Sequence, residues 1–201
     1  MTLISRRHPA IQDDLRAHGL SARHVFLGIE EKAEAEIIEE LNPGAAYDLI
    51  MVVLRSGQIE AALSRIAEAG LAGPILAVGN NLGDYAKQAA MVGPERFLLG
   101  FGIFGGYREG GGIVYLDGRT KEKPDLKRQG ETLVRVVSPA ACPAMEAARA
   151  ILERAGLPTR ESPAIAAWLV CHAALVFPLA GSMYAAGGDQ ARYCRPRDAL
   201  R

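Results

Sequence analysis

Residues 49–54 (LIMVVL) are all apolar, and a polar residue borders the run on each side. A run of this length, rich in β-branched residues and without polar alternation, is typical of a strand buried on both faces of a parallel sheet. The next apolar residues recur every three to four positions, which predicts a helix up to Gly70 with Ser56 as its N-cap. Ligands of open α/β sheets bind beyond the carboxyl ends of strands, so Arg55 and Gln58 are expected beside a ligand.

The same order of elements follows a second time. Residues 74–78 (PILAV) predict another buried strand, a polar turn follows, and a helix is expected from about Leu82 to Met91. Repetition of strand, turn and helix indicates the βαβ units of a parallel sheet. Asn80 lies in the second turn, at the same sheet edge as Arg55, so the two could line one ligand cleft. Ordinary turn chemistry explains either residue equally well.

The remaining pattern predicts a domain of mixed α/β structure followed by a helical segment. Ser162 and Pro163 are expected to open an apolar helix as N-cap and first helical residue. We therefore predict an α/β domain over residues 1–160, with a doubly wound and mostly parallel sheet, and the start of an α-helical C-terminal domain over 161–201. The other predicted elements are strands at 2–5, 24–29 and, as an edge strand, 131–137, a hairpin of 96–104 with 112–116, and helices at 9–18, 30–41 and 143–155.

The amino-acid composition limits which classes of partner are expected for the chain. Lys and Arg together number 23, as do Asp and Glu, which gives no electrostatic reason to expect nucleic acid or an anionic membrane. The three cysteines show neither CxxC nor zinc-ligand spacing. This pattern indicates free thiols in a reducing compartment. No apolar run is expected to cross a bilayer and no signal-peptide pattern is present, so the predicted location is the cytoplasm. No metal site is predicted.

Glycines 100, 102 and 105 (GFGIFG) spell the G-x-G-x-x-G pattern of dinucleotide sites. In such a site the glycines are followed by a helix whose N-terminus binds pyrophosphate. Here a predicted hairpin follows instead, which favours glycines that allow tight β packing.

Arg6 and His172 can each be interpreted in two ways, as a functional residue or as an ordinary structural one. Arg6 follows the first predicted strand, where an arginine can accommodate the 2′-phosphate of NADP, although a solvated arginine fits the position as well. His172 shares a helix face with Trp168, four residues earlier, and is either a core histidine with one hydrogen bond or a catalytic acid.

Five segments together resemble the ketopantoate reductase (2-dehydropantoate 2-reductase) family. They occur in the family's order over nearly the whole chain, and their order and spacing carry the resemblance more than any single motif. The segments are TLISRR, YDLIMVVLRSGQ, GNNLG, FGGYREGGGIVYLDG and ERAGLPTRESP.

The resemblance implies a Rossmann-type NADP-binding domain, a helical C-terminal domain and NADPH-dependent reduction of a small 2-oxo acid to a 2-hydroxy acid. Arg6 falls on the family's 2′-phosphate arginine. Arg55 falls where the family usually has a lysine near the cofactor phosphates and substrate, and Gln58 falls on its cofactor-contacting glutamine. Asn80 falls on the asparagine that touches nicotinamide and substrate.

Three departures qualify what the resemblance implies. The family begins with a strand and a G-x-G-x-x-G turn before the segment that matches TLISRR, and its helical domain is longer than residues 161–201. Absence of the first strand would expose a strand edge in mid-sheet, which favours association, so a homo-oligomer is one expected state. The family's general-acid lysine has no counterpart in AIAAWLVCHAALVFPL, where His172 is the one candidate proton donor.

Two alternatives to an active reductase therefore stay open. The chain could be a non-catalytic binding or interaction module that keeps the fold, because both the glycine turn and the lysine are missing. It could also be a piece of a longer enzyme.

Overall fold

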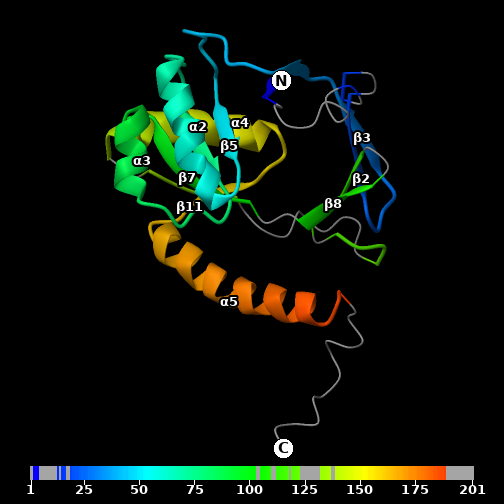
Figure 1. Cartoon of the computed structure of the whole chain (residues 1–201). Coiled ribbons are helices and arrows are strands. Elements are labelled where there is room, and N and C mark those ends of the chain that lie inside the picture. Colours follow the sequence, from blue (N-terminus) through cyan, green and yellow to red (C-terminus); the bar gives the residue numbers. More distant parts are fainter. Residues whose placement is uncertain are drawn as a thin grey trace, which may run out of the picture. The chain divides into compact units, whose positions relative to one another are not determined.

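A computed structural model describes residues 2–4, 13, 15–16, 19–102, 105–109, 112–117, 119–122, 132–136 and 139–188. The chain divides into two compact units, Met1–Pro163 and Ala164–Arg201 (Figure 1). The first unit contains the sheets, and the described part of the second is dominated by a single long helix. Most of the helix predicted at 9–18 lies outside the described residues.

The main sheet of the first unit has five strands in the order β11-β10-β7-β6-β5. Strands β5, β6 and β7 run parallel to one another, β10 is antiparallel to β7, and β11 is parallel to β10. This mostly parallel arrangement confirms the predicted α/β class. The strands are β5 (Ile50–Val53), β6 (Ile75–Val78), β7 (Phe97–Phe101), β10 (Thr132–Val136) and β11 (Thr159–Glu161).

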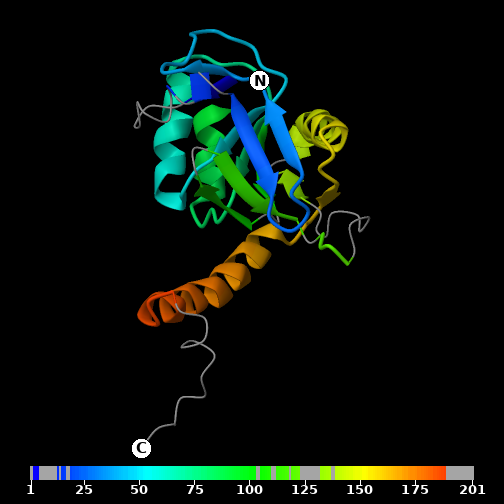
Figure 2. The same cartoon turned by 90° about the vertical axis from the view of Figure 1, so that its right-hand side faces the viewer.

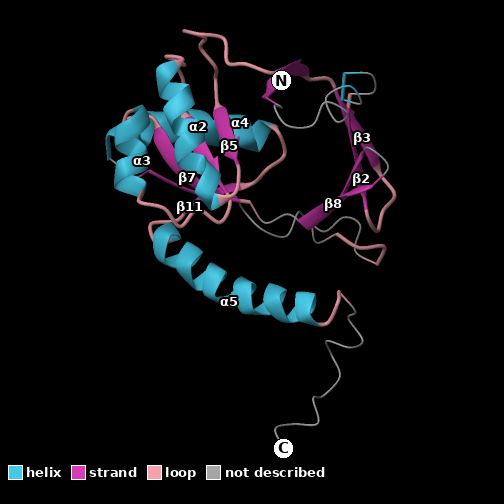
Figure 3. Ribbon diagram, in the orientation of Figure 1, coloured by secondary structure: helices cyan, strands magenta, loops and turns pink. Residues whose placement is uncertain are grey.

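Helices cover both faces of this sheet (Figure 3). Helices α2 (Ser56–Glu68) and α3 (Tyr85–Val92) lie side by side on one face, and α2 buries Ile59, Leu63 and Ile66. Helix α4 (Cys142–Arg154) lies on the other face. Its apolar side chains Ala144, Met145, Ala148 and Leu152 form one buried cluster with Leu76, Leu98 and Val134 of the sheet.

Strand β5 is not buried on both faces, so that prediction is wrong. Val52 is buried, but the side chains of Met51 and Val53 are 45% and 63% exposed. Met51 pairs with Leu76 and therefore points to the α4 face, where α4 packs on β6, β7 and β10. The six apolar residues belong to a strand at the edge of the sheet as the structure describes it.

A second sheet has four strands in the order β3-β2-β9-β8 (Figure 2). It combines β2 (Leu20–His24) and β3 (Glu30–Ala33) with the hairpin of β8 (Gly105–Glu109) and β9 (Gly112–Leu116). A separate two-stranded sheet pairs β1 (Thr2–Ile4), close to its predicted place, with β4 (Glu36–Ile38).

The helix predicted at 30–41 is wrong, because this stretch forms β3 and β4. The strand predicted at 24–29 is also misplaced: β2 ends at His24 and the chain reverses direction at Gly28, whose φ is +64°. The four residues of β3 (EEKA) are all exposed. The strand therefore lacks the alternation of apolar and polar residues by which a strand is recognised in a sequence.

The predicted hairpin is correct in its second strand but not in its first, because residues placed in the turn form β8. Strand β9 pairs with β8, whereas residues 97–101 form β7 of the main sheet. The edge strand predicted at 131–137 is the inner strand β10, because β11 adds outside it. The helix predicted at 143–155 is confirmed as α4.

The second unit contains helix α5 (Ile165–Ala185). Its N-cap is Ala164, which makes no side-chain capping bond, so the prediction that Ser162 and Pro163 open the helix is wrong. Ser162 is instead buried, and its N–H donates to the carbonyl oxygen of Val134 at 3.0 Å.

Helix α5 also overturns the expectation that no apolar run is long enough to cross a bilayer. It has 21 residues, and none of them is Asp, Glu, Lys or Arg. An 18-residue window of this helix has a mean hydropathy of 1.8, and 17% of that window is buried. Length and composition alone do not distinguish a bilayer-spanning helix from one covered by other protein elements. The absence of a membrane partner therefore stays a prediction.

Candidate functional site

The candidate site consists of two loops that follow the neighbouring parallel strands β5 and β6. The first loop carries Arg55, which is the N-cap residue of α2 and has extended backbone angles (φ −66°, ψ 147°). Its carbonyl oxygen accepts the N–H of Gln58 at 2.8 Å, and both side chains are exposed. Among the described residues, neither side chain has a hydrogen-bond or ion-pair partner, so both are available to a ligand.

The N-terminus of α2 suits an anion. The first turn contains no acidic residue, and no side chain caps it. Unpaired amides and the positive end of the helix dipole favour negative charge at such a terminus, and the Arg55 guanidinium adds a full positive charge beside it. The loop therefore offers a phosphate both charge and donors.

Ser56 does not cap α2 as predicted. Its Oγ accepts the backbone N–H of Leu82 at 3.2 Å, across to the loop after β6. The physical reason is that the bond to Leu82 directs the hydroxyl away from the amides of its own helix. The result is a fixed link between the two loops of the candidate site.

The second loop presents Asn80 through its neighbour Asn81. Gly79 has a φ of +126°, a conformation that glycine adopts without strain, and it begins the turn. Asn80 is exposed, while Asn81 is buried. The side chain of Asn81 donates to Gln88 Oε1 at 2.7 Å, and Asn81 Oδ1 accepts from Gln88 Nε2 at 3.2 Å and from Gly83 N at 3.1 Å.

Asn81 is thus a positioning residue that sequence reasoning missed. Both asparagines follow a buried strand, and nothing in the sequence states which one turns inward. A seven-residue separation from Gln88 equals about two helical turns, but this spacing is too common to identify an amide pair. The consequence is that Asn80 is held on a rigid turn with its side chain exposed.

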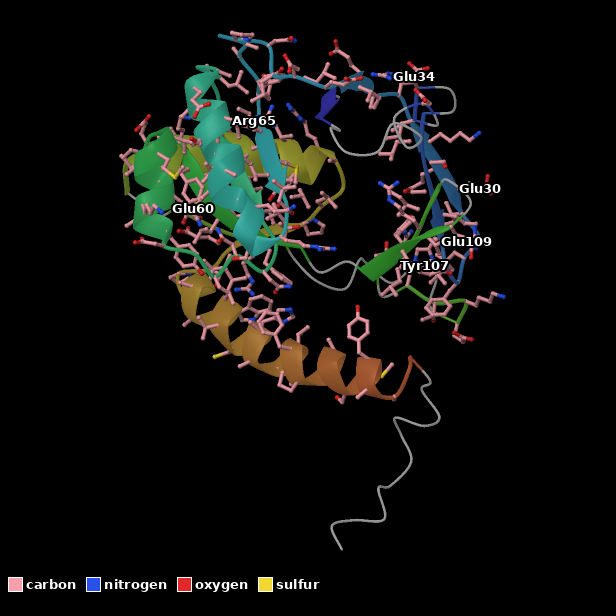
Figure 4. The ribbon with its side chains drawn as sticks, in the orientation of Figure 1. Glu30, Glu34, Glu60, Arg65, Tyr107 and Glu109 are labelled. Carbon is pink, nitrogen blue, oxygen red and sulfur yellow. The ribbon has the colours of Figure 1, made fainter. Side chains whose placement is uncertain are left out.

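Polar contacts between α2 and α3 also hold the two loops. Lys87 Nζ of α3 lies 2.5 Å from Glu60 Oε2 of α2, and Glu60 extends from α2 toward α3 (Figure 4). The hydrogen bond to Glu60 raises the pKa of Lys87 above its ordinary value. Asp84 caps α3 by accepting the N–H of Lys87 at 3.1 Å. Each loop therefore leads into a helix that is tied to the other.

His172 and Arg6 are not brought into this assembly. His172 lies on α5 in the second unit, where its ring stacks on Trp168 with a centroid separation of 4.8 Å and an interplanar angle of 9°. This confirms that the two residues share a helix face. Arg6 lies outside the described residues. The structure therefore gathers Arg55, Gln58 and Asn80, and the catalytic role of His172 stays a prediction.

A buried charged cluster in the four-stranded sheet was also missed. His24 Nε2 lies 2.9 Å from Asp117 Oδ1, and Arg119 makes a 2.7 Å ion pair with Asp117 Oδ2. The Nδ1 atom of His24 accepts the backbone N–H groups of Phe26 and Leu27, which leaves Nε2 to donate to the carboxylate. No pattern in the sequence indicated this cluster.

The cluster strongly favours the ionised carboxylate. Burial alone would raise the pKa of Asp117, but the hydrogen bonds from Arg119 and His24 outweigh burial and hold it well below its usual range. His24 and Asp117 are almost fully enclosed, so the cluster fixes the sheet instead of facing a ligand. Glu30, Tyr107 and Glu109 project from the exposed surface of the same sheet (Figure 4). Within the described ranges, no group of three or more His, Cys, Asp or Glu side chains is arranged to hold a metal ion.

A mostly parallel sheet with an anion-suited helix start and an exposed amide loop at its carboxyl edge is characteristic of the Rossmann-type α/β class. Comparison with known proteins identifies the family. The family model for ketopantoate reductase PanE/ApbA matches residues 1–123, which is more than half of the chain. The chain belongs to the ketopantoate reductase family.

Solved structures support the same fold. A 2-dehydropantoate 2-reductase candidate from Enterococcus faecalis is 24% identical, with a TM-score of 0.66 over 84% of this chain and 51% of that one. A D-mandelate dehydrogenase in a ternary structure with NADH and anilino(oxo)acetate is 23% identical, with a TM-score of 0.63 over 82% and 49%. A 2-dehydropantoate 2-reductase from Geobacter metallireducens GS-15 is 20% identical, with a TM-score of 0.59 over 80% of this chain and 49% of that one.

The chain thus spans about half the length of the solved structures it matches. At these identities the structural similarity establishes the fold, and the family membership rests on residues 1–123. No curated protein matches the sequence.

Proposed function

We propose that the chain provides the cofactor-binding half of an oxidoreductase that uses NADPH to reduce a small 2-oxo acid, such as ketopantoate, to the 2-hydroxy acid. The observation that carries the proposal is the pairing of the Arg55 loop with the Asn80 loop at the carboxyl edge of parallel strands in a chain of this family. When bound, the nicotinamide supplies the hydride for such a reduction.

Each loop residue has a role that its chemistry supports. Arg55, beside the open N-terminus of α2, would neutralise cofactor phosphate, and Gln58 on the first helical turn would donate or accept one hydrogen bond. The Asn80 amide would orient the nicotinamide carboxamide and the substrate carbonyl. His172 is the proposed donor of the proton that the new hydroxyl requires, because α5 contains no lysine.

The preference for NADPH over NADH rests on Arg6. A guanidinium binds a 2′-phosphate through charge and paired donors, whereas the 2′-hydroxyl of NADH offers no such charge. Arg6→Glu is therefore expected to weaken contact with NADPH far more than contact with NADH. Equal losses for the two cofactors would show that Arg6 does not bind the phosphate.

Binding of the cofactor by this chain is the first test of the proposal. Saturation-transfer NMR detects weak complexes and suits the test. We expect transfer from the chain to the nicotinamide protons of NADPH, reduced in Arg55→Gln and retained in Arg65→Gln, which removes the same charge at the opposite end of α2. Absence of transfer in the unmodified chain would contradict the proposal.

A second function is a non-catalytic module that keeps the fold. The lack of lysine in α5 and the exposed edge of β5 favour it. Oxidation of NADPH by the chain in the presence of ketopantoate would exclude this alternative. Binding of cofactor without turnover, at any concentration of 2-oxo acid, would support it.

A further inference from the structure

The loop after β6 uses its backbone amides in two different ways. The N–H of Asn81 donates to Gly79 O at 2.8 Å, and the N–H of Gly83 donates to Asn81 Oδ1 at 3.1 Å, so these amides stabilise the turn itself. The N–H of Leu82, between them, donates instead to Ser56 Oγ of the other loop at 3.2 Å. The turn is therefore stiff within itself, and Ser56 connects it to the start of α2.

The two loops also begin close together. Val53 and Val78 pair at the ends of β5 and β6, and a Cβ on Gly79 would lie 3.7 Å from Leu54 O. Past this point, the bond to Ser56 is the hydrogen bond that joins the two loops directly among the described residues. Loss of this bond would therefore release the tip of the second loop without unpairing the strands.

The hydroxyl of Ser56 keeps one hydrogen bond to give. A serine hydroxyl donates one hydrogen bond and accepts up to two, and in the described part of the chain Ser56 acts as an acceptor only. Ser56 is the first residue of α2, next to Arg55, at a helix end that no side chain caps. Accepting the N–H polarises the hydroxyl and makes it a stronger donor. An anion beside Arg55 is the acceptor that suits this donor.

We propose that Ser56 is a further cofactor-binding residue, whose hydroxyl donates to a cofactor phosphate beside Arg55 while it accepts the N–H of Leu82. This inference rests on the function proposed above and adds a coupling between the two loops. Because one hydroxyl makes both hydrogen bonds, a bound phosphate strengthens the link to Leu82 and steadies Asn80, two residues earlier. Phosphate binding thereby places the amide that orients the nicotinamide.

Hydrogen exchange of the Leu82 amide, followed by NMR, tests the link in the free chain. Ser56→Ala should speed this exchange by about threefold to tenfold, the effect of one lost hydrogen bond, and should leave the Gly83 amide unchanged. Ser56→Thr keeps a hydroxyl and should retain the slow exchange. The control is Ser64→Ala, which removes an α2 hydroxyl that donates to Glu68 at 2.9 Å and should affect neither amide.

The coupling is tested with NADPH and with 2′-phospho-ADP-ribose, which has the same phosphates but no nicotinamide. At saturating concentrations, we expect either compound to slow exchange of the Leu82 amide in the unmodified chain and in Ser56→Thr. Neither compound should slow it in Ser56→Ala. A saturation-transfer titration should also show NADPH binding weakened by about tenfold in Ser56→Ala, because a hydrogen bond to a charged acceptor is lost.

The outcomes separate this inference from the proposed function. If NADPH binds the unmodified chain and Ser56→Ala equally well, or slows the Leu82 amide in both, then Ser56 does not bind the phosphate and the proposed function stands. Slowing by NADPH but not by 2′-phospho-ADP-ribose would also overturn the inference, because the nicotinamide would then be the cause. Absence of NADPH binding by the unmodified chain would overturn both.

Discussion

The side-chain amides of Asn81 and Gln88 bond to each other in both directions, at 2.7 and 3.2 Å, and both residues are buried. This pair joins the loop after β6 to helix α3. The Asn81 oxygen also accepts the N–H of Gly83, and its main-chain oxygen accepts the Tyr85 hydroxyl at 2.8 Å. Four contacts on one residue therefore define the turn that presents Asn80.

Asn81→Ala should destabilise the first unit. The substitution removes both amide bonds and leaves the buried Gln88 amide without its partner, which costs about 1–3 kcal/mol. Urea unfolding followed by circular dichroism measures the free energy of unfolding. A loss below about 0.5 kcal/mol, the usual range of surface substitutions, would show that the pair does not hold the loop.

Asn80→Ala should leave the stability unchanged and weaken contact with the cofactor. Asn80 is exposed, so the free energy of unfolding should change by no more than about 0.5 kcal/mol. Saturation transfer to the nicotinamide protons of NADPH should fall in the same variant. Unchanged transfer would remove Asn80 from the proposed site and leave it as an ordinary turn residue.

The contrast between the two asparagines shows where sequence reasoning stops. The two βα units were predictable, because β5, α2 and β6 each follow a local hydrophobic period. The partners of each strand were not. Strand β5 was expected at the centre and lies at the edge, while β10 was expected at the edge and lies inside, because strand order depends on contacts between residues far apart in the chain.

The same limit applies to the candidate site. The sequence placed Arg55 and Asn80 after neighbouring strands, and the structure confirms that placement. It did not indicate that Ser56 binds the other loop, since a serine before a helix normally caps its own amides. Nor could it reveal the pairing of His24 with Asp117, which are 93 residues apart.

Gly73→Ala, in the loop between α2 and β6, should strongly destabilise the first unit. A Cβ at this position would lie 1.9 Å from the main-chain oxygen of Tyr47, in the segment that leads into β5, and the φ of Gly73 is +113°. Backbone must move to relieve this contact, so a loss of about 3 kcal/mol or more is expected. Gly70→Ala is the matched control, because its φ is also positive but no atom lies within 4 Å of the added Cβ. Its loss should stay at about 1–2 kcal/mol, the ordinary cost of a left-handed alanine.

The Asp117 cluster should make the stability of the first unit depend on acid pH. The folded state holds the pKa of this carboxyl below its ordinary value of 3.8, so the folded state favours the ionised form more than the unfolded chain does. The resulting stabilisation is complete above the ordinary value and is lost as the pH falls below it. Between about pH 5 and pH 2 the free energy of unfolding should therefore decrease.

Asp117→Asn tests this assignment because it keeps the shape and removes the charge. The variant should be less stable than the unmodified chain at pH 7, since Arg119 and His24 lose a charged acceptor, and its stability should fall less steeply between about pH 5 and pH 2. Glu109→Gln is the control: it removes a carboxylate from an exposed ion pair with Arg23 in the same sheet, where a loss below about 1 kcal/mol is expected. Urea unfolding at a series of pH values separates the two, and equal acid slopes for Asp117→Asn and the unmodified chain would assign the dependence to other carboxyl groups.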